Sequence, residues 1–269
     1  MMIKTIKRAF VLGMTSLILF AGLPATAVHA ADSAPVHTVA TVSGKESNPV
    51  VTYEIKLDKT RVTDGRLAVT YDPEVLTLVK AKGNVNFEEK DFNKDFKDGE
   101  RAGASYAFVH DNGKYVKGDL ITLTFNVNVG VEAQETALRT EVFVLSDGEK
   151  DVVSDLFLED VVEVGRPELK APQNVTLSQS VLGVEVSWDE DPAADGFTVY
   201  RSDSKDGTYR LVGSTKGNSL TNVWVNKNRT YYYKVVAYQQ YEKNQKVYSE
   251  ESEPVSITVQ SLLAAVLGN

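Results

Sequence analysis

The chain has no cysteine and only three histidines among its 269 residues. Without cysteine there is no disulfide, no thiolate metal site and no cysteine nucleophile. Only His37 and His110 follow residue 30, and two histidines are too few for a histidine-based metal cage. The G-x-S-x-G, H-E-x-x-H and P-loop patterns are also missing, and no motif marks a catalytic carboxylate pair. We therefore predict a protein that is not an enzyme and that has no catalytic residues and no cofactor.

Long apolar runs are missing everywhere except near the N-terminus. Lys4, Lys7 and Arg8 precede an apolar stretch from Ala9 to Leu23, and the small residues of ATAVHA end at Ala30. This order is typical of a secretory signal that is cleaved after Ala30. The apolar stretch is shorter than the ~20 residues that a membrane span needs. We predict a signal peptide over residues 1–30 and a secreted protein without a membrane span, either released or held at the cell surface by non-covalent contacts.

Positive charge is scarce in the remaining chain. Removal of the signal peptide lowers the net charge from −8 to −11, which makes the protein a poor partner for nucleic acid. The segment GRPELKAP, Gly165–Pro172, separates a part with a net charge of −10 from a part with a net charge of −1. We predict one domain over residues 31–165, a linker over 166–172, a second domain over 173–260 and a short apolar tail over 261–269.

Alternating apolar residues indicate β-strands in the first domain. β-branched and aromatic residues are dense in each segment, and Gly, Asn and Asp separate the segments. Short strands without long helical patterns between them are typical of a sandwich or jelly roll. The four clearest candidates are Val50–Leu57, Arg66–Tyr71, Ser105–His110 and Leu120–Val129.

The second domain shows the same alternation in seven segments within fewer than a hundred residues. This number and spacing predict an immunoglobulin-like sandwich. The segments are Asn174–Gln179, Gly183–Trp188, Phe197–Ser202, Thr208–Ser214, Ser219–Val225, Thr230–Tyr238 and Pro254–Val259.

The second domain resembles a fibronectin type III domain. The motifs that carry the resemblance are APQNVTL at the start, VSW in the second strand, TYYYKVVAY in the sixth and SEPVSITV in the last. The resemblance implies that Trp188 is the buried core tryptophan and that Tyr231 forms the tyrosine corner. Such domains in secreted bacterial proteins act mostly as spacers or weak interaction modules.

The first domain resembles a cohesin over roughly residues 36–164. The motifs that carry the resemblance are LAVTYDPEVLTLVKAKG (Leu67–Gly83) and YAFVHDNGKYVKGDLITLTFNV (Tyr106–Val127). It implies a jelly-roll β-sandwich, related in fold to carbohydrate-binding modules, that acts as a non-catalytic receptor for dockerins. The expected fold class is thus all-β, with a jelly-roll sandwich followed by a seven-stranded immunoglobulin-like sandwich.

The resemblance also points to a binding strand. In many cohesins the strand that leads to YDP begins Asn-x-Asp-Phe, and its polar side chains accept hydrogen bonds from dockerin hydroxyls. The corresponding residues here run from Asp64 to Leu67, and Arg66 replaces an acceptor with a group that only donates. The candidate partner-binding residues are Asp64, Arg66 and Thr70.

The stretch DFNKDFKDGE, residues 91–100, is rich in acids but lacks an EF-hand pattern. Counted from Asp91, the sixth position holds Phe96 where the calcium loop needs glycine. We predict no tight calcium site and a helical turn that places Phe92 and Phe96 on one face. A weak calcium site would use the oxygen-bearing side chains Asp91, Asn93, Asp95 and Asp98.

Two kinds of partner remain open for a secreted, non-catalytic protein of this kind. One is a dockerin-like protein, and the other is a polysaccharide, in an extracellular glycan-degrading or cell-surface context. An exposed platform of Tyr232, Tyr238 and Tyr241 would suit sugar stacking. A third interpretation is a purely structural surface spacer that has no specific ligand.

Overall fold

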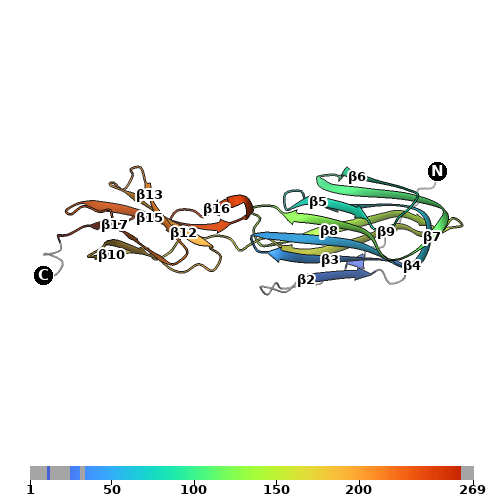
Figure 1. Cartoon of the computed structure of the whole chain (residues 1–269), viewed down its shortest axis with the longest axis horizontal. Helices are drawn as coiled ribbons and strands as arrows, with labels where there is room; N and C mark the ends of the chain where they lie inside the picture. Colours follow the sequence, from blue (N-terminus) through green and yellow to red (C-terminus); the bar gives the residue numbers. More distant parts are fainter. Residues whose placement is uncertain (1–10, 13–24, 31–33, 262–269) are drawn as a thin grey trace, which may run out of the picture. The chain divides into compact units, whose positions relative to one another are not determined.

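The computed structural model describes residues 11–12, 25–30 and 34–261. The chain divides into two compact units, Met1–Arg166 and Pro167–Asn269, called here the first and the second unit. The division lies inside the segment that the sequence predicts as a linker. Both units are built from β-strands, and the one short helix among the described residues is the 3₁₀ turn η1, Glu242–Asn244 (Figure 1). The all-β fold class is confirmed.

Two long strands organise the first unit. β4 (Asn48–Tyr71) and β7 (Arg101–Val127) pair antiparallel from Val50 opposite Asn126 to Tyr71 opposite Ala102. Each of the two strands spans two of the four short strands that the sequence predicts. The other strands are β1 (Val11–Leu12), β2 (Ala25–Ala30), β3 (Val36–Lys45), β5 (Leu76–Gly83), β6 (Glu89–Asp98), β8 (Gln134–Ser146) and β9 (Asp151–Val164).

The shorter strands flank this ladder in two groups. β3 pairs with the first half of β4 and β5 with the second half of β7, which makes one layer. β8 pairs with the second half of β4 and β6 with the first half of β7, and β9 extends this second layer. The long ladder thus belongs to both layers, and the first unit is a β-sandwich of the jelly-roll kind.

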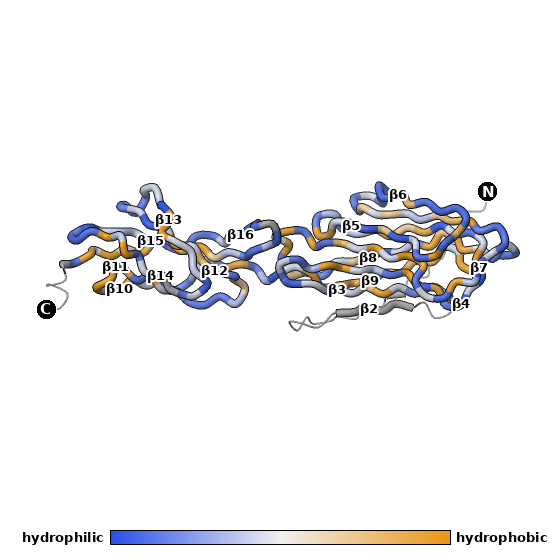
Figure 2. The backbone as a smooth tube through the Cα atoms, viewed as in Figure 1, coloured by the Kyte–Doolittle hydropathy of each residue, from blue (hydrophilic) through white to orange (hydrophobic). Residues whose placement is uncertain are grey.

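A continuous apolar core separates the two layers. It includes Tyr53, Ile55, Leu123 and Phe125 from the first layer and Leu138, with many others, from the second. Apolar and polar residues alternate along the strands that face it, as the colouring of Figure 2 shows. This alternation is what a two-layered sheet structure requires, because successive side chains point to opposite faces of a strand.

The N-terminal region differs from expectation in one respect. The sequence predicts that residues 1–30 stand outside the fold, and most of them lie outside the described residues. In the chain that retains these residues, however, β1 pairs with β9, and the whole of β2 pairs with β3, from Ala25 opposite Val42 to Ala30 opposite His37. The physical reason is that β3 otherwise has an open edge of backbone donors and acceptors. Cleavage after Ala30 stays a prediction, and it would leave that edge of β3 free.

The second unit is a sandwich of two sheets. One sheet has the order β10-β11-β14, and the other has the order β13-β12-β15-β16, with β17 also pairing with β15. All seven predicted strands are present, and β16 is an additional short strand. The strands are β10 (Thr176–Ser180), β11 (Gly183–Ser187), β12 (Gly196–Ser202), β13 (Arg210–Thr215), β14 (Ser219–Asn222), β15 (Thr230–Gln240), β16 (Lys246–Tyr248) and β17 (Val255–Thr258).

The two residues singled out for this core occupy the expected places. Trp188 is 3% exposed and its ring centroid lies 5.2 Å from that of Phe197. Tyr231 is buried, and its hydroxyl accepts a hydrogen bond of 3.0 Å from the backbone N–H of Asn226, five residues upstream. A tyrosine that bonds back to the preceding backbone is the corner of an immunoglobulin-like sandwich. The second unit is therefore a fibronectin type III-like β-sandwich.

Candidate binding face

The second layer of the first unit has an outer face that centres on Arg66. Along β4, Leu67, Val69 and Tyr71 point into the core, so Arg66 and Ala68 point away from it. Arg66 is exposed. The strand predicted to carry the partner-binding residues therefore does present one of them to solvent. We call the outward side of β6, β7, β4 and β8 the outer face.

The floor of the outer face consists of small residues. On β7, Tyr106 and Phe108 belong to the core, so Gly103, Ser105 and Ala107 lie on the outward side. Ala107 stands opposite Arg66, and Ser105 stands opposite Ala68. Ala107 is exposed and Ser105 is half-buried, whereas Ala68 is buried and Gly103 lies under the ring of Phe96. The strip is therefore open to close approach at Ser105 and Ala107.

Longer side chains border the small-residue floor. On the β8 side, the guanidinium of Arg66 lies over the ring of Phe143, 4.8 Å from its centroid, which is a cation–π contact. Further along β8, Arg139 forms an ion pair of 2.5 Å with Glu159 of β9.

On the β6 side, Asp91 stands opposite Ala107, and Asn93 stands opposite Ser105. The floor thus has an aromatic and cationic border on one side and an acidic and amide border on the other.

Thr70 does not take the role that the sequence suggests. It points outward but is only 6% exposed. Its hydroxyl accepts a hydrogen bond of 3.2 Å from Nε of Arg101, and the same guanidinium donates to the carbonyl of Thr70. Burial, followed by the nearby charge of Arg139, lowers the pKa of Arg101. The prediction of Thr70 as a contact residue is therefore corrected: Arg101 covers it, and Arg101 is the group available in its place.

Asp64 lies at the end of the outer face, where β4 has an irregular register. One of its carboxylate oxygens accepts a hydrogen bond of 2.7 Å from the hydroxyl of Thr63. The side chain is half-buried. Asp64 therefore retains acceptor capacity at this end of the face, and its contact with a partner stays a prediction.

The acidic stretch is a strand and not a helical turn. Residues 89–98 form β6, and Gly99, with a φ of +61°, turns the chain into β7. A register shift between Asn93 and Phe96 places Phe92 opposite Tyr106 and Phe96 opposite Gly103. Since Tyr106 and Gly103 face opposite sides, the predicted shared face of Phe92 and Phe96 is wrong: the extra residue of the bulge separates them.

The acids of β6 therefore alternate along an extended strand and do not converge. Within the described residues, no group of three or more histidine, cysteine or acidic side chains is arranged to hold a metal ion. The weak calcium site of Asp91, Asn93, Asp95 and Asp98 has no such cluster to support it.

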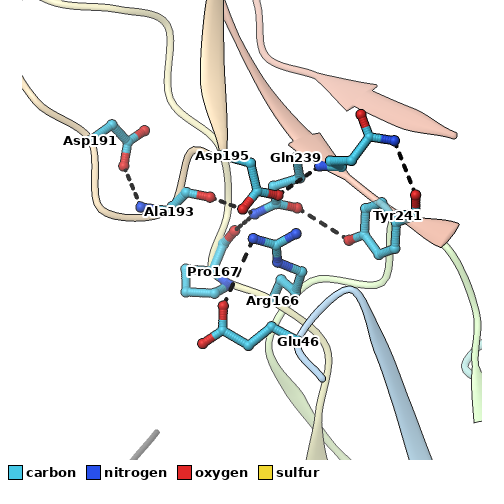
Figure 3. A network of polar contacts seen from close by, with 9 residues as sticks. Glu46, Arg166, Pro167, Asp191, Ala193, Asp195, Gln239 and Tyr241 are labelled. Atoms are coloured by element: carbon cyan, nitrogen blue, oxygen red, sulfur yellow. Dashed lines mark hydrogen bonds and ion pairs between the residues drawn. The ribbon is translucent and has the colours of Figure 1, made fainter. Parts of the chain in front are cut away.

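The expected tyrosine platform of the second unit is not formed. Tyr238 and Tyr241 are 8% and 6% exposed. Lys246 covers the ring of Tyr238, with Nζ 3.6 Å from the centroid. The hydroxyl of Tyr241 donates to Oε1 of Gln239, whose amide in turn donates to the carbonyls of Pro167 and Ala193 (Figure 3). These two tyrosines stabilise the end of the second sandwich, so Tyr232, which is half-buried, cannot form a platform with them.

An exposed aromatic residue that sequence analysis did not identify lies elsewhere in the second unit. Trp224 follows β14 and is 83% exposed. The signal in the sequence is the run Val223–Trp224–Val225, in which three consecutive apolar residues interrupt the alternation of a half-buried strand.

Comparison with known proteins gives only distant structural likeness. No protein-family model and no curated protein sequence matches the chain. Among solved structures, a two-domain fibronectin type III segment from chicken tenascin is 14% identical, with 82% of this chain and 97% of that chain covered and a TM-score of 0.28. Domains A168–A170 from titin are 14% identical, with 83% and 75% covered and a TM-score of 0.32. A β-1,2-glucanase from Parabacteroides distasonis is 13% identical, with 88% and 36% covered and a TM-score of 0.28. Similarity at this level says nothing about function.

No helix among the described residues has the length and apolar character needed to cross a membrane.

Proposed function

We propose that the chain is a secreted, non-catalytic binding protein whose outer face on the first unit recognises a dockerin-like protein. The second unit then acts as a spacer. The proposal is supported by the cohesin resemblance of the sequence and by the position of Arg66 on the exposed side of β4. A non-catalytic binding or structural role agrees with the fibronectin type III-like sandwich of the second unit.

The observation that carries the proposal is the small-residue floor. Its accessible residues are Ser105 and Ala107, which follow one another on the outward side of β7, and Ala107 stands opposite Arg66 of β4. Small residues allow a partner to approach closely, and the bordering side chains supply polar contacts at the rim. Arg66 and Arg101 both donate hydrogen bonds, so the complementary partner surface should present carbonyls, hydroxyls or carboxylates.

Protein capture with matched variants tests the proposal. The full mature chain is immobilised and exposed to secreted proteins from the same source, and bound proteins are identified by mass spectrometry. We expect a partner with paired calcium loops whose binding is lost on calcium chelation. Ala107→Trp, which fills the floor, and Arg66→Asp, which reverses its charge, should each weaken binding at least tenfold.

The controls introduce the same two residues, tryptophan and aspartate, on the other layer. Val79 on β5 is 57% exposed and Lys80 follows it, so Val79→Trp and Lys80→Asp should leave binding unchanged. Equal loss in all four variants would show that the outer face is not the binding surface. Retention on cellulose or xylan that the Ala107→Trp variant loses, without any captured protein, would favour the polysaccharide alternative.

A further inference from the structure

One end of the second unit carries a group of exposed apolar side chains. Val181 and Leu182 form the turn between β10 and β11 and are 79% and 70% exposed. Val223 and Trp224 follow β14 and are 54% and 83% exposed. We call these four residues the apolar tip. Single exposed apolar residues need no explanation, but neighbouring ones mark interaction sites.

The two halves of the apolar tip are adjacent. β11 pairs with β14, with Val184 opposite Asn222, so the residues just beyond this pair face one another. Gly183 has a φ of +145°, and a Cβ placed on it would lie 2.2 Å from the carbonyl oxygen of Asn222 and 3.0 Å from Cα of Val223. Such close backbone contact requires glycine and holds the Val181–Leu182 turn beside Val223 and Trp224.

The chain leaves the described fold next to the apolar tip. The backbone N–H of Gln260 donates to Oε1 of Gln179 at 2.8 Å, and Nε2 of Gln179 donates to the carbonyl of Gln260 at 3.0 Å. On the other side, Asn228 donates to the carbonyl of Val259, and Val259 donates to that of Arg229. The exit point is thus hydrogen-bonded both to the strand before the Val181–Leu182 turn and to the loop that contains Trp224.

The residues that follow are apolar. Leu262–Leu267, with the sequence LLAAVL, carry no charged or polar side chain and lie outside the described residues. Six extended residues span up to ~20 Å, which is ample to cross four neighbouring side chains. We propose that the apolar tip is a docking site for an apolar peptide and that residues 262–267 of this chain occupy it.

Proximity favours this occupant over the alternatives. Hydrogen bonds attach Gln260 to Gln179, which lies two residues before Val181. The effective concentration of residues 262–267 at the apolar tip is therefore in the millimolar range typical of short linkers. A second copy of the chain or a lipid surface has to compete with that concentration. Docking removes both the tail and Trp224 from water without any further partner, since the hydrophobic effect is non-directional and follows the apolar area buried.

Tryptophan fluorescence of the full chain tests the proposal directly. The chain has two tryptophans, of which Trp188 is buried and Trp224 is on the apolar tip. We expect that deletion of residues 262–269 shifts the emission to longer wavelength and raises acrylamide quenching severalfold. Addition of the synthetic peptide SLLAAVLGN should reverse both changes. Leu263→Asp should act like the deletion, whereas Asn269→Asp, with the same added charge outside the apolar run, should not.

The Trp224→Phe variant is the control that assigns the signal. Its substitution is at an exposed position, so the fold is retained, and the deletion should then leave emission unchanged. Unaltered fluorescence after deletion in the chain that retains Trp224 would overturn the proposal. Protection that appears only at high protein concentration would replace the tail by a second copy, and protection that appears only with phosphatidylglycerol vesicles would replace it by a lipid surface. Both of those results would also refute docking of the tail.

Discussion

Two tyrosines in the core of the first unit provide a matched test of how its polar groups are stabilised. Tyr53 and Tyr106 are 0% and 1% exposed. The hydroxyl of Tyr53 donates to Oδ2 of Asp160 at 2.8 Å and lies 2.9 Å from the hydroxyl of Thr140. The same carboxylate oxygen accepts from Thr38 at 2.6 Å. The hydroxyl of Tyr106, by contrast, finds no hydrogen-bond partner among the described residues. Removal of the hydroxyl therefore has opposite consequences at the two sites.

The size of the expected loss of stability in Tyr53→Phe follows from the burial of Asp160. Asp160 is 2% exposed, so a lost donor is not replaced by bulk water. A hydrogen bond to a charged group contributes about 1.5–3 kcal/mol, and we expect Tyr53→Phe to lower the free energy of unfolding by about 2–3 kcal/mol. At roughly 2–4 °C per kcal/mol for a domain of this size, the melting temperature of the first unit should fall by about 5–10 °C. Tyr106→Phe relieves an unsatisfied buried hydroxyl, and its effect should lie between about zero and 1 kcal/mol of stabilisation.

Scanning calorimetry and urea unfolding of the full chain measure both variants. Only the transition of the first unit should move, and the second unit serves as the internal control. If Tyr53→Phe and Tyr106→Phe changed the free energy of unfolding equally, the hydrogen bonds to Asp160 would contribute nothing, and the reasoning would be refuted. A Thr38→Val variant should act in the same direction as Tyr53→Phe, since it removes another donor to the same oxygen.

Three further outcomes follow from the structure. Trp188→Ala should destabilise the second unit by roughly 3–5 kcal/mol and leave the first unchanged, and calorimetry with a single shared transition would contradict this. Burial raises the pKa of Tyr106 to about 12, whereas the unfolded value is 10.0, so its contribution to stability is complete below pH 10 and is lost as the pH rises towards 12. The unfolding free energy of Tyr106→Phe should therefore decline less than that of the unaltered chain between pH 10 and 12. Calorimetric titration with calcium should show no binding with a dissociation constant below about ten micromolar. Tighter binding that is lost in Asp95→Ala would contradict this prediction.

The strands of the second unit were predictable because apolar and polar residues alternate regularly along them. In β15, Tyr231, Tyr233, Val235 and Ala237 all belong to the core, as the period of two requires. What alternation did not predict is the additional strand β16 and the connection from it to β17. There the hydroxyls of Ser249 and Ser252 accept hydrogen bonds from the backbone of Ala237 and Val235. Side-chain oxygens therefore continue the ladder where backbone carbonyls leave it.

The long strands of the first unit were not predictable from local sequence. Residues 58–65 and the run Asp111–Lys114 have the composition of turns, so each long strand reads as two short ones. The structure pairs these segments with each other, with Thr60 opposite Val116 and Val62 opposite Lys114. The guanidinium of Arg61 then donates to the carbonyls of Asn112 and Asp147. Strand pairing between segments more than fifty residues apart determines the conformation here, and local strand propensity cannot predict such pairing.

The candidate face was predictable only in part, for the same reason. Arg66 was found because it sits in a strand motif, whereas Ala107 and Phe143, which complete its surroundings, come from strands about 40 and 80 residues later. The alternation along β4 places Thr70 on the side of the sheet that faces away from the core. The side chain of Arg101, which follows 31 residues later in the sequence, nevertheless covers it. Alternation predicts the side of a sheet on which a residue lies but not what lies above it.

The acidic stretch of residues 91–100 has a structural explanation that needs no metal. β6 pairs only with β7 among the described strands, so its other edge presents free backbone groups. An open edge invites pairing with another chain, and charged side chains and bulges are the usual protection. β6 has both, because Lys94 and Asp95 sit at its register shift and charged residues precede and follow them. The clustered charges thus keep the edge strand that borders the candidate face from pairing with another chain, and the face itself stays open to a partner.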